Sequence, residues 1–446
     1  MRRILLVEPS YRNKYPPLGL MKLSTYHKLK GDFVQFTKGC IPQLRQSKWD
    51  RIYVSTLFTF NWKTSIDTIH YYRRAVELPD DIVVGGVLAT LLGDEIRQET
   101  GAKVVQGLLD RPGILDPGDK RIIDVLTPDY RILDEIDYDY GVQDAYIGYA
   151  TRGCPNRCGF CAVSRIEPEF SDYQPLKRQV QSIESLYGQK QHLMLMDNNV
   201  LASNQFEQII NDILDLGFEK GARLNRKFRY VDFNQGIDLR RLTPEKMNLL
   251  AKIALRPLRL AFDHIELKDD YTKCIRLAVD SGITHLSNYV LFNYTDTPQD
   301  FYERLRINVE LNKELGTQIY SFPMKYIPLD AKDRTYIGRH WNRRLIRGVQ
   351  CILLATKGKV GTHLDFFEAA FGRTPEEFIE IAMMPEEYII HRRKHENNGA
   401  FEWREAFQAL TNKQRENFMK VVSDSKLCEE DTLFAHLLEH YTRSKV

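Results

Sequence analysis

The stretch that decides the fold is YIGYATRGCPNRCGFCAVS, residues 146–164. Its first six residues have the pattern of a buried strand, and three cysteines follow in the spacing C-x3-C-x2-C. These are Cys154, Cys158 and Cys161. A closed zinc site and an ordinary electron-transfer iron–sulfur cluster each need four ligands. The three grouped thiols lack a fourth ligand at zinc-finger spacing, because the next histidine is His192.

Five further strand patterns follow this first strand, with helical patterns between them. The strands are expected at 192–196, 228–233, 258–262, 286–292 and 318–325. Thr243-Pro244 and Thr297-Pro298 begin two of the helices, since Thr caps a helix well and Pro is tolerated at its first position. Six βα units predict a partial (β/α)6 TIM-like barrel over residues 146–328. In such folds the chemistry lies at the C-terminal ends of the strands, and the cysteines lie there.

Residues 1–107 show a shorter alternation of strands and helices, which predicts a small doubly wound α/β domain. A linker rich in Asp, Pro and Gly is expected at 108–145. A helical C-terminal region is expected at 329–446, where two segments begin with Pro followed by two Glu. The chain is therefore predicted to be an α/β protein of three parts joined by one linker.

Composition limits the classes of protein that the chain can belong to. It has 446 residues, 43% of them hydrophobic, and a net charge of only +3, so the whole chain is not an obvious polyanion binder. We expect neither a secretion signal nor a membrane span, because Glu8-Pro9-Ser10 interrupts the first apolar run. Seven cysteines without such a signal argue against a disulfide framework. A cytoplasmic location is expected.

The cysteine motif, with the aromatic Phe160 before the third cysteine, resembles the radical S-adenosylmethionine (SAM) superfamily. The resemblance extends to residues 195–199, 234–238, 261–264 and 282–294, and it covers about residues 1–326. The small α/β domain in front is similar to that of the subclass with a cobalamin-binding domain, in PPLGLMKLSTYHKLKG and IVVGGVLATLLGDEI.

The resemblance implies a [4Fe-4S] cluster with three irons held by the cysteine thiolates and the fourth bound by SAM. A structural zinc knuckle is the alternative. The residues implied to bind the cofactors are Phe160, Asp197, Asn198, Gln235, Asp263 and Asn293. Asp197 is implied to meet the SAM ammonium, with a helix N-cap as the alternative role. Asp263 would meet the ribose, although the family usually carries the longer Glu there.

Cobalamin is not expected, although the first domain resembles its carriers. The family's D-x-H-x-x-G motif is missing, because His27 lies in a helical pattern and His70 has no Asp two residues before it. The other cysteines, Cys40, Cys274, Cys351 and Cys428, are scattered singly and are expected to be inert. Without a second grouped set, methylthiotransferases and enzymes with auxiliary clusters are disfavoured.

The substrate is predicted to be a small polar, planar molecule that contacts Asp238, Lys325 and Tyr326 near the strand ends. Asp238 could instead pair with Arg240 or Arg241. The reaction expected is hydrogen abstraction, for example by a lyase acting on a nucleobase such as queuine, with flavodoxin or ferredoxin as reductant. A cobalamin-dependent methyltransferase and a tRNA- or peptide-modifying enzyme are alternatives within the superfamily. An electron carrier or sensor is the alternative outside catalysis.

One basic stretch, RTYIGRHWNRRLIRG at residues 334–348, has two interpretations. It could contact phosphate or nucleic acid, so nucleic-acid binding stays open. We favour a helix face that packs on acidic neighbours, because the chain has no strong basic excess.

Overall fold

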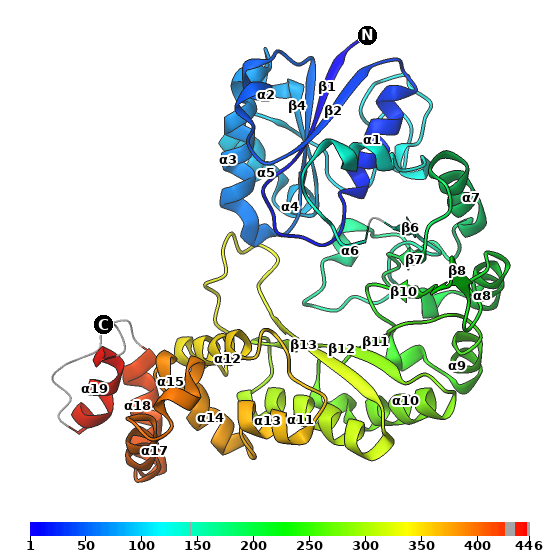
Figure 1. Cartoon of the computed structure of the whole chain (residues 1–446). Helices are drawn as coiled ribbons and strands as arrows, with labels where there is room; N and C mark the ends of the chain where they lie inside the picture. The colour runs from blue at the N-terminus through cyan, green and yellow to red at the C-terminus, as the bar shows by residue number, and fades with distance from the viewer. Residues whose placement is uncertain (143, 424–432, 444–446) are drawn as a thin grey trace. The chain divides into compact units, whose positions relative to one another are not determined.

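The computed structural model describes residues 1–142, 144–423 and 433–443. The chain forms two compact units (Figure 1). The first contains Met1–Gln235, Asn248–Leu255 and Ile327–Tyr336. The second contains Gly236–Met247, Arg256–Tyr326 and the described residues from Ile337 onward. None of the described helices is both long and apolar enough to span a membrane.

The first unit begins with a five-stranded parallel sheet in the order β2-β1-β3-β4-β5 (Figure 1). The strands are β1 (Arg3–Glu8), β2 (Phe33–Lys38), β3 (Arg51–Thr56), β4 (Ile82–Gly86) and β5 (Lys103–Val104). Alternate side chains of these strands, such as Leu5 and Val7, pack against Ile69 and Ile96 in one core. The prediction of a small doubly wound α/β arrangement is confirmed at this level.

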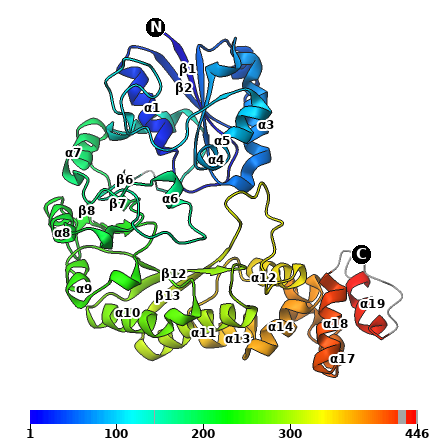
Figure 2. The ribbon, with the colours of Figure 1, turned by 180° about the vertical axis from the view of Figure 1, so that it is seen from behind.

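Helices cover both faces of this sheet, as Figures 1 and 2 show from opposite sides. α1 (Leu18–Lys28) lies on one face, while α3 (Trp62–Tyr72) and α5 (Gly93–Thr100) lie on the other. Two shorter helices, α2 (Pro42–Gln46) and α4 (Val87–Leu91), complete this part.

The segment between β5 and β6 has only short 3-10 turns among its described residues, η4 (Ile123–Val125) and η5 (Tyr130–Glu135). Ion pairs hold it against the first sheet. Asp116 lies 2.6 Å from Lys30 Nζ and 2.8 Å from Arg51 Nη1. This acidic segment therefore packs on the domain through charge pairs rather than through regular structure.

A second sheet of the first unit has three parallel strands in the order β10-β7-β6. They are β6 (Ala145–Gly148), β7 (His192–Leu195) and β10 (Val231–Phe233). The elements around them are α6 (Val163–Ile166), α7 (Leu176–Tyr187), α8 (Phe206–Asp215) and the hairpin β8 (Arg223–Leu224) with β9 (Lys227–Phe228).

The second unit contains another three-stranded parallel sheet, in the order β11-β12-β13. Its strands are β11 (Leu258–Ala261), β12 (His285–Phe292) and β13 (Gln318–Lys325), and α10 (Lys268–Asp280) and α11 (Pro298–Leu315) lie along one face (Figure 1). Helix α9 (Pro244–Leu250) crosses the division between the units. On the opposite face of β13, Tyr320, Phe322 and Met324 are 50%, 43% and 48% exposed.

The six strands predicted for a barrel are all present, but the described residues arrange them as two three-stranded sheets. β10 is only three residues long. After it, Asn234 and Gln235 form a turn. The remaining pairing is limited to isolated bridges, one between Val231 and Leu255 before β11 and one between Ile237 and Leu260 of β11. An α/β fold with parallel sheets is thus confirmed, and the closed arrangement of a barrel stays a prediction.

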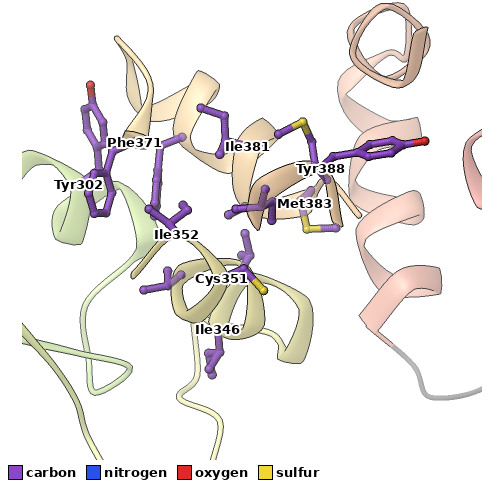
Figure 3. Packing of buried hydrophobic residues seen from close by; sticks show 14 of the residues in the cluster. Tyr302, Ile346, Cys351, Ile352, Phe371, Ile381, Met383 and Tyr388 are labelled. Carbon is purple, nitrogen blue, oxygen red and sulfur yellow. The ribbon is translucent and has the colours of Figure 1, made fainter. Parts of the chain in front are cut away.

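The described residues after 342 are largely helical. The helices are α12 (Arg343–Ala355), α13 (Leu364–Phe371), α14 (Pro375–Met383), α15 (Glu386–Ile390), α16 (Arg392–His395), α17 (Ala400–Gln408), α18 (Asn412–Ser423) and α19 (Ala435–Arg443). Their apolar sides form a core that includes Ile346, Ile352, Phe371 and Ile381 (Figure 3).

The basic stretch enters α12. Arg347 Nη2 lies 2.6 Å from Glu386 Oε2, and Arg344 Nη1 lies 3.8 Å from Oε1 of the same carboxylate. For these two arginines the interpretation as a helix face packed on an acidic neighbour is confirmed, while Arg339 and His340 are exposed.

Candidate functional site

The three grouped cysteines lie on the loop that leaves the carboxyl end of β6. Cys154, Cys158 and Cys161 are half-buried. The N–H of Cys161 donates to the carbonyl of Cys158 at 3.0 Å, which forms a turn before α6. All three thiols therefore follow the first strand of their sheet at the edge where the sequence predicted them.

The stem of this loop is closed by a backbone pair. Arg152 N–H donates to Ser171 O at 3.1 Å, and Ser171 N–H donates back to Arg152 O at 2.9 Å. Gly153 follows with a φ of +71°, and a Cβ there would lie 2.3 Å from the carbonyl oxygen of Glu169. This position requires glycine, because both the backbone conformation and the close approach exclude a side chain.

Asp197, just after β7, holds the start of the loop. Its Oδ1 accepts from Thr151 Oγ1 at 2.7 Å, from Thr151 N–H, and from Ala150 N–H at 3.0 Å. Its Oδ2 accepts from Ala150 N–H at 3.1 Å. Burial raises the pKa of this carboxyl to about 6, while the hydrogen bonds from Thr151 and Ala150 oppose the rise. Asp197 thus joins the end of β7 to the chain that leaves β6. These hydrogen bonds occupy most of the acceptor capacity of the Asp197 carboxylate.

Glu167, also buried, holds the next part of the stem. Its Oε2 accepts from Gly153 N–H at 2.7 Å and from Asn198 Nδ2 at 3.1 Å, and its Oε1 lies 3.0 Å from Arg152 Nη2. Neighbouring Asn199 donates from Nδ2 to Cys154 Sγ at 3.5 Å. Two carboxylates therefore fix the loop stem, while the cysteines lie beyond it.

The donor types on the loop can be set against the cluster that the family resemblance implies. Three cysteines within eight residues suit an iron–sulfur cluster held by three thiolates. Among the described residues, no three His, Cys, Asp or Glu side chains are grouped closely enough to hold a metal ion. The donor types fit the cluster, and binding would require the loop beyond Gly153 to gather its thiols around it.

The other predicted cofactor residues of the first unit also follow strand ends. Phe160 is half-buried in the cysteine loop, and Asn198 bonds to Glu167 as described. Gln235 is exposed and donates from Nε2 to Asn234 Oδ1 at 3.0 Å. Asn234 in turn donates to Tyr15 OH at 2.7 Å. The first unit therefore brings together the cysteines, Phe160, Asp197 and Asn198.

Asp238 belongs to the second unit, where it takes up the alternative pairing considered from the sequence. Its Oδ1 lies 2.7 Å from Arg240 Nε, its Oδ2 3.1 Å from Arg240 Nη2, and Arg241 Nε is 3.8 Å from Oδ2. It also caps η7 (Leu239–Arg241) through the N–H of Arg240.

The remaining predicted residues, Asp263, Asn293, Lys325 and Tyr326, gather at the carboxyl ends of β11, β12 and β13. Burial raises the pKa of the Asp263 carboxyl. Asn293 is fully buried with a φ of +69°; it accepts from Gly338 N–H at 2.7 Å and donates to Tyr326 O at 3.1 Å. Its amide therefore joins two strand ends to the following loop. The Tyr326 ring lies 4.6 Å from that of Tyr294.

Arg304 on α11 supports these strand ends and was missed from the sequence. The fully buried guanidinium donates from Nη1 to the carbonyls of Phe262, Asp263 and Leu291 at 2.8, 2.9 and 2.8 Å. Its Nη2 lies 2.9 Å from Asp296 Oδ2. An arginine in an otherwise amphipathic helix carries no signal of this role.

His27 and two of the single cysteines, Cys274 and Cys351, are buried in the fold. In α1, His27 Nδ1 lies 2.8 Å from Asp32 Oδ2 and Nε2 lies 2.9 Å from Tyr53 OH, so both ring nitrogens are engaged. Burial raises the pKa of the Cys274 thiol to about 11, which keeps it protonated. Cys351 is buried in the helical core, Cys40 is exposed, and Cys428 lies outside the described residues.

Comparisons with known proteins do not identify a family for this chain. No family model matches the chain, and no curated protein matches it. Among solved structures, the crystal structure of Streptococcus suis SuiB bound to precursor peptide SuiA is similar at 13% identity, with a TM-score of 0.33. The likeness covers 48% of this chain and 46% of that chain. A TM-score this low does not establish a common fold.

Proposed function

We propose that this chain is a radical SAM enzyme. The observation that carries the proposal is the motif C-x3-C-x2-C directly after β6, at the carboxyl edge of a parallel sheet, on a loop whose stem is fixed by Asp197 and Glu167. Parallel α/β folds bind ligands at this edge. Cys154, Cys158 and Cys161 would hold a [4Fe-4S] cluster with one iron left open for the amino and carboxylate groups of SAM.

Held by Cys154, Cys158 and Cys161, the cluster would supply the one-electron reduction of SAM, with flavodoxin or ferredoxin as the electron source, for hydrogen abstraction from the substrate. The chain's own residues position the cysteine loop. Asp197 and Glu167 keep the two ends of the loop together, so that gathering of the thiols moves only the loop beyond its stem. Asn198 and Gln235 of the first unit are proposed to contact SAM.

The substrate is proposed to be a small planar molecule, such as a nucleobase. The exposed Tyr320, Phe322 and Met324 on one face of β13 support this class, because aromatic and thioether side chains stack on flat rings. Lys325 and Tyr326 at the end of the same strand, with Asp238, are proposed to contact the polar edge of that molecule.

Reconstitution tests the cluster. Protein treated anaerobically with iron and sulfide should gain iron-dependent absorption and release 5′-deoxyadenosine from SAM when reduced by dithionite. Replacing Cys154, Cys158 and Cys161 with Ala should abolish both, and Cys40→Ala, which removes an exposed single thiol, should abolish neither. Bound zinc in place of iron, or 5′-deoxyadenosine release by the triple variant, would contradict the proposal.

A substrate panel tests the class of molecule. Free nucleobases, including queuine and other 7-deazaguanines, are compared with tRNA and with peptides for stimulation of 5′-deoxyadenosine release. Stimulation by a nucleobase is expected. Stimulation by tRNA alone that is lost as salt rises would replace the small-molecule class with RNA and assign Arg339 and Arg343 to phosphate contacts.

A further inference from the structure

A cavity of about 380 Å³ lies within the first unit, apart from the cysteines. It is bounded by α1, the segment of residues 124–128, β6 with the chain after it, and α7. Its volume is at the small end of the range for small-molecule sites, roughly 300–1,000 Å³. The cavity therefore suits one compact molecule and excludes a folded chain or a nucleic acid.

The charged groups that line the cavity are mostly cations: Lys22, Arg152 and Arg178 face a single carboxylate, Asp124. Lys22 Nζ lies 3.0 Å from Asp124 Oδ1 and also donates to the Asp124 carbonyl, so this pair is nearly neutral. Arg178 on α7 is exposed, and it forms no ion pair within the part of the chain that the structure describes. Because Glu167 pairs with Arg152 from outside the lining, the net positive charge of the cavity rests on Arg178.

Arg152 forms part of the same wall. It is 8% exposed, and its guanidinium lies 3.9 Å above the ring of Tyr149. Nη2 pairs with Glu167 at 3.0 Å and lies 3.6 Å from Asp124 Oδ2, but Nε is buried and has no hydrogen-bond partner among the described residues. A buried N–H without a partner costs roughly 1–3 kcal/mol, so such groups usually meet a ligand or a water.

The rest of the lining is apolar or weakly polar. Leu126, Ile147 and Ile183 form the apolar wall, and Val125 at the rim is 69% exposed. Ser182 adds a hydroxyl on the same helix as Arg178. A charged end and an apolar wall together favour a ligand with one anionic group on a flat or apolar body.

We propose that this cavity binds a small molecule that carries a carboxylate or phosphate group on an apolar, planar body, with the anion between Arg178 and Arg152. Arg152 lies two residues before Cys154, so the ligand would contact the stem of the cysteine loop. The proposal does not depend on the proposed function, because every group it uses lies outside the cysteine motif.

Titration calorimetry tests the proposal on the full chain without added metal, with three probes of one shape: phenyl phosphate, benzoate and benzyl alcohol. We expect saturable binding of at least one anion at a single site, and none of the neutral alcohol. If phenyl phosphate binds more tightly than benzoate, the natural ligand carries a phosphate. If benzoate binds more tightly, the natural ligand carries a carboxylate.

Two variants and a control locate the site. Arg178→Gln should weaken anion binding by about tenfold or more, the loss expected for one charge-assisted hydrogen bond. Ser182→Leu, which fills the cavity without changing charge, should abolish binding. Arg131→Gln removes an exposed arginine outside the lining and should bind as the wild type does. Unchanged affinity in Arg178→Gln and Ser182→Leu, equal binding of benzyl alcohol, or no saturable binding of either anion overturns the proposal.

Discussion

Thr151 donates from Oγ1 to Asp197 Oδ1 at 2.7 Å, and this bond joins the chain leaving β6 to the end of β7. The carboxylate also accepts the backbone N–H groups of Ala150 and Thr151. Asp197 therefore stabilises the base of the cysteine loop, whatever else it contacts when SAM is bound.

The pH dependence of stability should report Asp197. Burial raises the pKa of its carboxyl in the folded chain from 3.8 to about 6. Between about pH 4 and pH 6 the folded chain thus binds more protons than the unfolded chain, so the free energy of unfolding falls as pH rises. At about 1.4 kcal/mol per unit, the loss amounts to about 3 kcal/mol and is complete above about pH 6.

Urea unfolding at intervals between pH 4 and pH 7 measures this slope. Asp197→Asn has no charge to desolvate, so its stability should lack the fall seen in the wild type across this window. Asp215→Asn, at an exposed carboxylate paired with Lys177, should keep the wild-type slope. A wild-type slope in Asp197→Asn would show that Asp197 does not titrate as its burial requires.

Glu167→Gln should loosen the cysteine loop. Arg152 would lose the nearer of its two anionic partners, because Glu167 Oε1 lies 3.0 Å and Asp124 Oδ2 lies 3.6 Å from its Nη2. We expect the loss to cost about 1–3 kcal/mol. We expect the cysteines of the metal-free protein to react several-fold faster with iodoacetamide, measured by mass spectrometry of the loop peptide. Glu169→Gln, at an exposed carboxylate two residues away, is the control and should react at the wild-type rate. Equal rates in both variants would refute a positioning role for Glu167.

The sequence predicted what depends on local patterns. Alternating apolar segments located the six strands of the two three-stranded sheets. The Thr297-Pro298 signal marked the start of α11 correctly, where Thr297 accepts from the N–H of Asp300 at 3.1 Å. The cysteine spacing located the loop after β6. Each of these features is encoded within a few neighbouring residues.

Contacts between distant residues were not predictable. Glu167 meets Arg152 only because the loop folds back through the Arg152–Ser171 pair, and no motif surrounds it. Asp238 has two arginines within three residues, so its pairing was visible as an alternative, but the choice depended on the fold around η7. The separation of the barrel strands into two sheets follows from the short β10, which no propensity marked.

Gly153→Ala should destabilise the loop stem more than a matched glycine elsewhere. Gly113 has a similar φ of +78°, but a Cβ there would meet nothing within 4 Å, whereas at Gly153 it would lie 2.3 Å from Glu169 O. Both variants bear the cost of a left-handed backbone, roughly 1–2 kcal/mol, and only Gly153→Ala adds the clash with backbone. Hydrogen–deuterium exchange of residues 150–171 should therefore rise in Gly153→Ala and stay at the wild-type level in Gly113→Ala. Equal exchange in the two variants would mean that the stem tolerates the side chain.

Arg304→Lys should open the strand ends of the second unit. The guanidinium serves three carbonyls and Asp296 at once, and a lysine ammonium has only three donors on a flexible stem, so at least one of these buried acceptors loses its partner. The expected cost is about 3 kcal/mol or more, since the partner carboxylate is itself buried. Hydrogen–deuterium exchange should increase in peptides that cover residues 258–263 and 285–293, next to Asp263 and Asn293. Arg276→Lys, at an exposed pair with Glu314, should change stability by less than about 1 kcal/mol and leave this exchange unaltered. If Arg304→Lys behaves as Arg276→Lys does, the strand ends are held by the sheet alone, and Arg304 has no part in positioning the predicted SAM contacts.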